Sequence, residues 1–167
     1  MTAHRNCEQN IDKTPHRELW PQWRRIAAKP KISQSIRDLY DQLDQEVSQR
    51  NPTCWISGRC CNFDQFEHRL YVTGLEIAWV LNQSPLPPEH QIDLQAPCPY
   101  QVTKLCSIHG SRPMGCRVFF CQKGTENWQQ KLYEQTMNKI RDLHVKHAIT
   151  YRYLEWRRGL AEALEQV

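Results

Sequence analysis

The spacing of the cysteines constrains this chain more than any other feature of its 167 residues. Cys7 stands apart near the start of the chain. The other seven cysteines form two groups in the middle: Cys54, Cys60 and Cys61, then Cys98, Cys106, Cys116 and Cys121. Hydrophobic residues make up 40% of the chain, somewhat fewer than an ordinary domain contains. The composition therefore favours a core that metal or covalent links help to hold.

The first residues favour metal over disulfides. Residues 1–9 contain no apolar stretch behind a basic start, so we find no secretory signal and predict a cytoplasmic protein. Clustered cysteines in a reducing cytosol bind metal more often than they form disulfides. Seven is an odd number, which leaves one thiol over in any disulfide scheme. Because a closed zinc site takes four ligands, binding by all seven implies more than one metal ion.

The adjacent pair Cys60 and Cys61 favours a polynuclear site. Successive side chains point to opposite faces of a strand and about 100° apart on a helix. We therefore expect the two thiols to serve two neighbouring ions, or two irons of one cluster, rather than one small ion. Three arginines stand close to cysteines in the sequence: Arg59, Arg112 and Arg117. They either lower the pKa of a ligating thiol or are ordinary surface charges.

The choice between iron and zinc depends on ligand numbers. An iron–sulfur cluster of the [4Fe–4S] type takes three or four cysteines and leaves the others unused. Two zinc ions could use all seven thiolates with one bridging, or with one histidine. His109 is the first histidine candidate and His68 a weaker one. The adjacent cysteines favour the iron–sulfur cluster, with zinc as the alternative.

Apolar residues at intervals of three and four predict helices in the first half of the chain. One runs from Ser33, its expected N-cap, to Arg50, where Asn51-Pro52 ends it. A short helix over residues 73–82 begins at Thr73, with Glu76 as its capping-box partner. The stretch over residues 84–99 holds five prolines and is predicted to be an extended loop that delivers Cys98.

The last third of the chain is also predicted to be helical. A long helix follows Gly124 and Thr125, and a final helix covers residues 151–165. His144 and His147 are three residues apart on the long helix, where we expect a solvated face rather than a metal site. Together these elements predict a mainly α protein: a flexible arm over residues 1–17 and a single domain over residues 18–167. In that domain three or four helices pack around central irregular loops, which a cysteine-ligated metal centre pins.

Charge and hydropathy exclude two classes of partner. The net charge of +4 is spread along the chain without a block of basic residues, which argues against nucleic acid as a partner. The longest apolar run covers only residues 77–81, far short of the roughly 20 residues that a membrane span needs. We expect a soluble protein, and the sequence assigns no oligomeric state.

The order of the cysteine motifs carries a family resemblance. The segment Cys54-Trp-Ile-Ser-Gly-Arg-Cys60-Cys61, then Cys98-Pro99, Cys106 and Arg112-Pro113-Met-Gly-Cys116-Arg117, resembles the YkgJ-type cysteine-cluster family. That family is described as a zinc- or iron-chelating domain with a CxxCxxCC motif. The second cysteine of this motif falls on Ser57 here, and a serine hydroxyl is a poor substitute for a soft thiolate ligand.

The resemblance also implies an enzymatic alternative. The YkgJ-type family is similar to flagellin lysine N-methylases, which are thought to use S-adenosylmethionine and an iron–sulfur cluster. This chain has no glycine-rich nucleotide loop after a strand, so S-adenosylmethionine is expected from the resemblance alone. We predict a metal-binding protein with a structural or redox role, whose ligands come from the seven clustered cysteines. The alternative is a methyltransferase that acts on lysine residues of a protein substrate.

Overall fold

The computed structural model describes residues 16–54, 57–87 and 91–166. Its elements follow in the order α1 (His16–Ala27), α2 (Pro30–Arg50), the 3-10 helix η1 (Arg59–Cys61), β1 (Tyr71–Thr73), α3 (Gly74–Gln83), β2 (Gln101–Val102), β3 (Leu105–Cys106), α4 (Met114–Val118), α5 (Glu126–Lys146), β4 (Tyr153–Glu155) and α6 (Trp156–Leu164). The protein is mainly α, as predicted. The described part has six α-helices, so the expectation of three or four was wrong.

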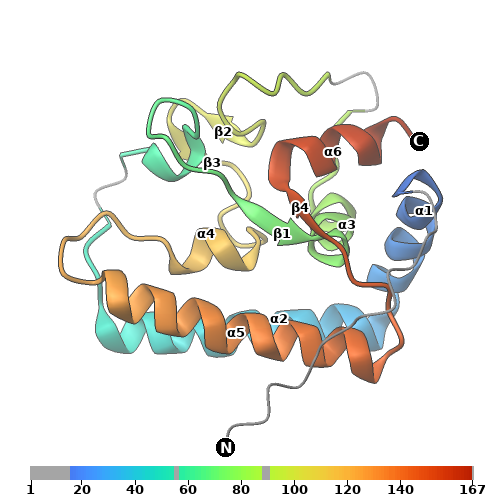
Figure 1. The fold of residues 1–167 in the computed structure, drawn as a ribbon, viewed down its shortest axis with the longest axis horizontal. Helices are drawn as coiled ribbons and strands as arrows, with labels where there is room; N and C mark the ends of the chain where they lie inside the picture. Colours follow the sequence, from blue (N-terminus) through green and yellow to red (C-terminus); the bar gives the residue numbers. More distant parts are fainter. Residues whose placement is uncertain (1–15, 55–56, 88–90, 167) are drawn as a thin grey trace, which may run out of the picture.

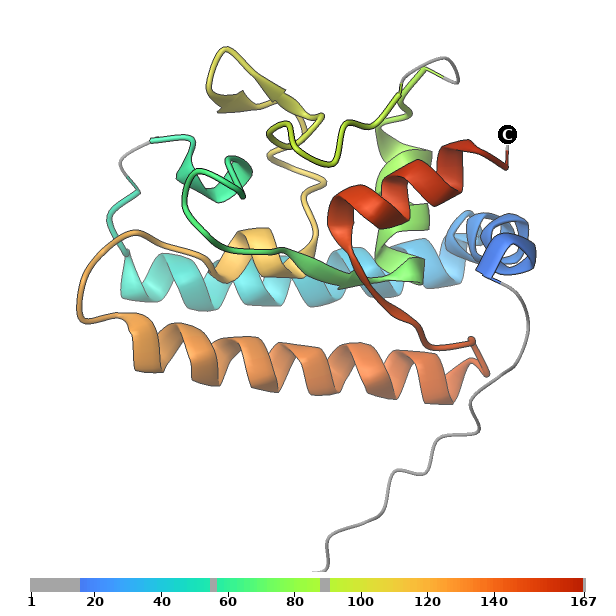
Figure 2. The ribbon, with the colours of Figure 1, turned by 45° about the horizontal axis from the view of Figure 1, so that its top comes forward.

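The two longest helices form the base of the fold. Helices α2 and α5 lie side by side, and α4 packs against both (Figure 1). Above them β1 and β4 pair antiparallel, with Val72 opposite Leu154. Helices α1, α3 and α6 gather at one end of the molecule, and η1 with the β2–β3 hairpin lies at the other (Figure 2). The cysteine-bearing loops therefore lie largely at the other end from α1, α3 and α6, with Cys61 and Cys98 reaching into the core.

The contact between α1 and α3 depends on a glycine. Helix α1 presents Trp23, which is fully buried, to the start of α3 at Gly74. A Cβ atom at Gly74 would lie 2.5 Å from Cζ3 of the Trp23 ring. The ring cannot easily withdraw, because its Nε1–H donates to the carbonyl oxygen of Thr150 at 3.0 Å. Glycine is therefore the residue that lets α1 and α3 meet.

The carboxylate of Glu76 joins three helices. The predicted capping box at Thr73 is confirmed: Thr73 Oγ1 accepts from the Glu76 N–H, and the Thr73 N–H donates to Glu76 Oε2 at 2.9 Å. The Thr73 hydroxyl also donates to Oε2, at 3.0 Å. Oε1 accepts from the Tyr40 hydroxyl of α2 at 2.8 Å and from the Met114 N–H of α4 at 3.1 Å. This buried carboxylate thus fixes α4, which carries Cys116, to α2 and α3.

Two predicted helix starts were wrong. Helix α2 begins at Pro30, with Lys29 as N-cap, because proline is favoured in the first turn of a helix. Ser33 lies inside α2, where its Oγ accepts from Trp79 Nε1 at 3.0 Å. The final helix begins at Trp156 rather than near residue 151, since the preceding residues form β4 and pair with β1. The predicted end of α2 at Arg50 is confirmed.

Helix α1 was not predicted, and its sequence explains why. Leu19, Trp20, Trp23 and Ala27 follow a helical spacing and are all buried. Pro21 lies inside the helix, where proline normally argues against helical structure. The helix begins at His16, so the predicted arm over residues 1–17 overlaps it, and residues 1–15 lie outside the described residues.

His144 differs from its prediction. Its side chain is buried rather than on a solvated face. The ring packs edge-on against Tyr151, and Nδ1–H donates to the carbonyl oxygen of Ile149 at 3.1 Å. Burial lowers the pKa of His144 below its usual value. His144 is therefore a neutral core residue that holds the chain where it leaves α5.

Among the residues that the structure describes, no helix combines the length and apolar character needed to cross a bilayer.

Candidate metal centre

The turn at η1 brings the two adjacent cysteines together. Gly58, with φ +70°, precedes η1, and a Cβ atom there would lie 2.8 Å from Gln101 Nε2. Within the tight turn of η1 the Sγ atoms of Cys60 and Cys61 are 3.9 Å apart. This distance reflects the 3-10 turn, whereas the sequence prediction considered only a regular strand or α-helix.

Backbone hydrogen bonds place the second cysteine group against the first. The Cys98 N–H donates to the Cys61 carbonyl oxygen at 2.7 Å. The β2–β3 hairpin follows, in which Gln101 pairs with Cys106. The Gln101 side chain donates to the Gly58 carbonyl oxygen at 3.0 Å. These hydrogen bonds hold the central loops together.

Four thiols form the inner group, with Cys61 at its centre. The Cys61 thiol interacts with Cys106, Cys60 and Cys98, and these contacts together with burial raise its pKa. The hydrogen bond with Cys61 is the main cause that lowers the pKa of Cys60 to about 7 and that of Cys106 to about 6. It also lowers the pKa of Cys98, with help from Trp156. The lowered pKa values of Cys60, Cys98 and Cys106 favour the thiolate, which is the form that binds metal.

Cys116 lies beside the inner group rather than within it. It belongs to α4, and burial raises the pKa of its thiol well above the usual value. The charges of Cys98 and Cys60 raise that pKa further, which reflects how near these thiols are.

The three arginines near cysteines have three different roles. Arg112 acts on the thiols, since its charge adds to the effect of Cys61 in lowering the pKa values of Cys60 and Cys106. Arg117 is buried and paired with Asp44 of α2 at 2.5 Å. Arg59 is exposed and lies over the Phe66 ring. Of the two roles that the sequence left open, Arg112 therefore lowers the pKa of thiols, and Arg59 is a surface charge.

Arg117 fastens the loop before α4 to α2. Its Nε–H donates to the Arg112 carbonyl oxygen at 2.9 Å, and an Nη2–H donates to the Gly110 carbonyl oxygen at 2.6 Å. The guanidinium carbon lies 4.4 Å from the centre of the Tyr40 ring. These contacts hold the segment between Cys106 and Cys116 in one conformation.

A cavity of about 340 Å³, here called the cysteine cavity, opens beside the inner group. It is lined by six of the predicted ligands: Cys54, Cys60, Cys61, Cys106, Cys116 and Cys121. Cys98 does not line it. Cys54 is exposed, and Cys121 Sγ lies 3.8 Å from Ser57 Oγ. The seven predicted residues thus lie in one region, at two depths, and all seven are free thiols.

Only one of the two candidate histidines reaches the cysteine cavity. His109 lines it, and its Nε2 accepts from an Nη1–H of Arg112 at 2.7 Å. Burial, followed by the charge of Arg112, lowers the pKa of His109, so the ring is neutral at pH 7. His68 instead stacks on Phe119, with 5.5 Å between ring centres.

A second cavity of about 500 Å³ adjoins the first and is here called the tyrosine cavity. It is lined in part by Tyr71, Tyr133 and Tyr153. Tyr71 and Tyr153 stack on each other, and the hydroxyls of Tyr133 and Tyr153 are hydrogen bonded. The two cavities share four lining residues: Cys60, Cys116, Phe119 and Phe120. A molecule in the tyrosine cavity would therefore lie against two of the thiols.

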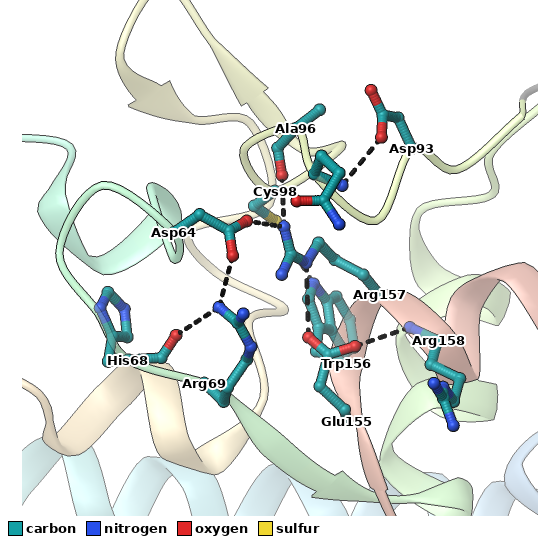
Figure 3. Close-up of polar contacts among 11 residues, drawn as sticks. Asp64, His68, Arg69, Asp93, Ala96, Cys98, Glu155, Trp156, Arg157 and Arg158 are labelled. Atoms are coloured by element: carbon teal, nitrogen blue, oxygen red, sulfur yellow. Dashed lines mark hydrogen bonds and ion pairs between the residues drawn. The ribbon is translucent and has the colours of Figure 1, made fainter.

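The start of α6 lies beside Cys98, as Figure 3 shows. The Trp156 indole N–H donates to Cys98 Sγ at 3.3 Å. The next residue, Arg157, is buried and donates to Asp64 and to the Ala96 carbonyl oxygen, each at 2.7 Å. Sequence analysis missed Trp156 and Arg157 as site residues. Both come from the predicted final helix, and no spacing in the sequence relates them to the cysteines.

The inner thiols fit the donor set of a soft metal. With a Zn–S bond of about 2.3 Å, two ligands of a tetrahedral site lie about 3.8 Å apart. The Cys60 and Cys61 Sγ atoms are 3.9 Å apart, which matches that edge. Across residues 16–54, 57–87 and 91–166, no three Cys, His, Asp or Glu side chains are already arranged to hold a metal ion. An entering ion would replace the thiol–thiol contacts around Cys61.

Comparison of the chain with family models, curated proteins and solved structures gives no match. The family resemblance of the cysteine motifs stays a prediction.

Proposed function

We propose that this protein binds a soft metal through the inner thiols Cys60, Cys61, Cys98 and Cys106, in a structural or redox role. One observation carries the proposal: cysteines from two distant segments gather around the thiol of Cys61, with Cys60 beside it in one segment and Cys98 and Cys106 in the other. Their lowered pKa values favour thiolates, which zinc and iron both accept. The positive charge of Arg112 partly offsets the negative charge that such a centre concentrates.

Two forms of the centre fit different parts of the site. The contact distance at Cys60 and Cys61 favours one ion held tetrahedrally by the four inner thiolates, for which zinc is the first candidate. An iron–sulfur cluster would lie between its ligands and hold them further apart. It fits the cysteine cavity better, with ligands from the six cysteines that line it. The two forms therefore differ in their use of Cys98 and Cys121.

Replacing Cys98 or Cys121 by serine separates these forms. For a single ion we expect Cys98→Ser to lose most of the bound metal, while Cys121→Ser keeps it. For a cluster we expect the reverse. The measurement is elemental analysis with an absorption spectrum on protein purified without oxygen. A cluster gives a broad band near about 400 nm, and zinc gives none. Wild-type protein free of metal after anaerobic loading with zinc or with iron and sulfide would contradict the proposal.

The tyrosine cavity favours a second candidate function, a methyltransferase that uses S-adenosylmethionine. This cavity shares Cys60 and Cys116 with the cysteine cavity, so an organic cosubstrate there would lie beside the metal centre. For this function we expect calorimetry to detect binding of S-adenosylmethionine to the metal-loaded protein. Substituting Gly115, which also lines the tyrosine cavity, by Trp should abolish the heat of binding. No heat with fully loaded wild-type protein would exclude this candidate.

A further inference from the structure

The hydrogen bond between Trp156 and Cys98 is isolated from solvent. The indole N–H donates to Cys98 Sγ at 3.3 Å, and both residues are buried. Cys98 is the one inner thiol that does not line the cysteine cavity. Water therefore has no ready route to replace the indole N–H as a donor to this sulfur.

Independent contacts fix both partners of this bond. On the donor side, Arg157 follows Trp156 directly and is anchored to Asp64, as Figure 3 shows. On the acceptor side, Arg157 also holds the Ala96 carbonyl oxygen, two residues before Cys98. The Cys98 N–H in turn donates to the Cys61 carbonyl oxygen. Contacts other than this hydrogen bond therefore help to hold the Trp156 indole N–H near the Cys98 sulfur.

We propose that Trp156 is a positioning residue for the metal centre, which orients Cys98 Sγ toward the other inner thiols and withdraws electron density from that sulfur once it is ligated. This inference rests on the proposed function of the inner thiols. Hydrogen bonds to ligating sulfurs help to set the reduction potentials of iron centres, and outer partners of metal ligands typically change metal affinity by about 10- to 100-fold. Trp156 is placed to do both, because its ring is buried and packs near Tyr100, with 6.1 Å between the ring centres.

The test compares Trp156→Phe with a matched control, Trp79→Phe. Trp79 is also buried and also donates an indole hydrogen bond, to Ser33 Oγ, far from the cysteines. We expect Trp156→Phe to weaken zinc binding about 10-fold in competition with a chelator, and Trp79→Phe to leave it unchanged. In the cobalt-loaded protein, the sulfur-to-cobalt charge-transfer band of Trp156→Phe should move to lower energy, because Cys98 Sγ becomes richer in electrons. Loss of packing alone would not produce that shift.

A measurement on wild-type protein covers the case in which Trp156→Phe does not fold. With an NMR-active cadmium isotope bound, the Trp156 indole proton should show scalar coupling to cadmium through the hydrogen bond. An unchanged band and affinity in folded Trp156→Phe, or no coupling in the cadmium-loaded wild type, would overturn the inference. The proposed function fails differently: the wild-type protein would then bind no metal after anaerobic loading with zinc or with iron and sulfide.

Discussion

Replacing Glu76 by Ala should lower the free energy of unfolding by about 4 kcal/mol. The buried carboxylate accepts four hydrogen bonds, two from Thr73 and one each from Tyr40 and Met114. Removing it leaves these donors without a partner in a buried region, and each such group costs about 1–3 kcal/mol. Because Met114 begins α4, the loss also releases the helix that carries Cys116. The measurement is equilibrium unfolding in urea.

Two variants calibrate this result. Tyr40→Phe removes one of the four donors and should cost about 1 kcal/mol. Glu134→Ala removes an exposed glutamate that accepts from Gln130 on the same helix, and should change stability by less than about 0.5 kcal/mol. If Glu76→Ala were no worse than Glu134→Ala, the carboxylate would not be the junction of α2, α3 and α4 described above.

Arg117→Met should cost about 3 kcal/mol of stability and reduce metal retention. The buried guanidinium donates to the carbonyl oxygens of Gly110 and Arg112, which would lose their partners. Its ion pair contributes less to this figure, because Asp44 is about half exposed and water screens the attraction. The freed segment carries Cys106 and Cys116 at its two ends, so the inner thiols would meet less often.

Urea unfolding and metal content of the purified protein check both effects of Arg117→Met. Arg141→Met is the control, since Arg141 lies on the exposed face of α5 and has a contact of 3.4 Å to Asn138. The control should behave as the wild type does. Wild-type metal content in a destabilised Arg117→Met would mean that the loop is positioned by other contacts.

Local signals predicted the helices that local residues determine. Thr73 and Glu76 define the start of α3 by themselves, and the apolar spacing of α5 needs no partner. The start of α6 was mispredicted because Tyr153 is extended only through its pairing with Thr73, a contact that spacing cannot reveal. In α1, Pro21 argues against a helix when only the sequence is considered. Packing of its buried face against α3 makes the helix stable.

The same distinction applies to the site. The cysteines could be identified from the sequence because thiols in one cluster are chemically distinctive. The position of each thiol relative to the cysteine cavity could not be predicted, because the fold, rather than its place in the sequence, separates Cys98 from that cavity. The short distance between the Cys60 and Cys61 thiols could not be predicted, because it depends on a single turn at Gly58. Trp156 and Arg157 carry no sequence signal at all for a role at the cysteines.

The packing of α6 on Cys98 also affects the order in which contacts form during folding. Trp156 meets a cysteine 58 residues earlier, and Arg157 meets an aspartate 93 residues earlier. Contacts of such long range form slowly, because the chain between them must first be ordered. The contact between Cys60 and Cys61 is local and needs only one turn. During folding, Cys60 and Cys61 can therefore meet while they are still open to solvent and oxidants, so a reducing environment matters most before the last helix docks.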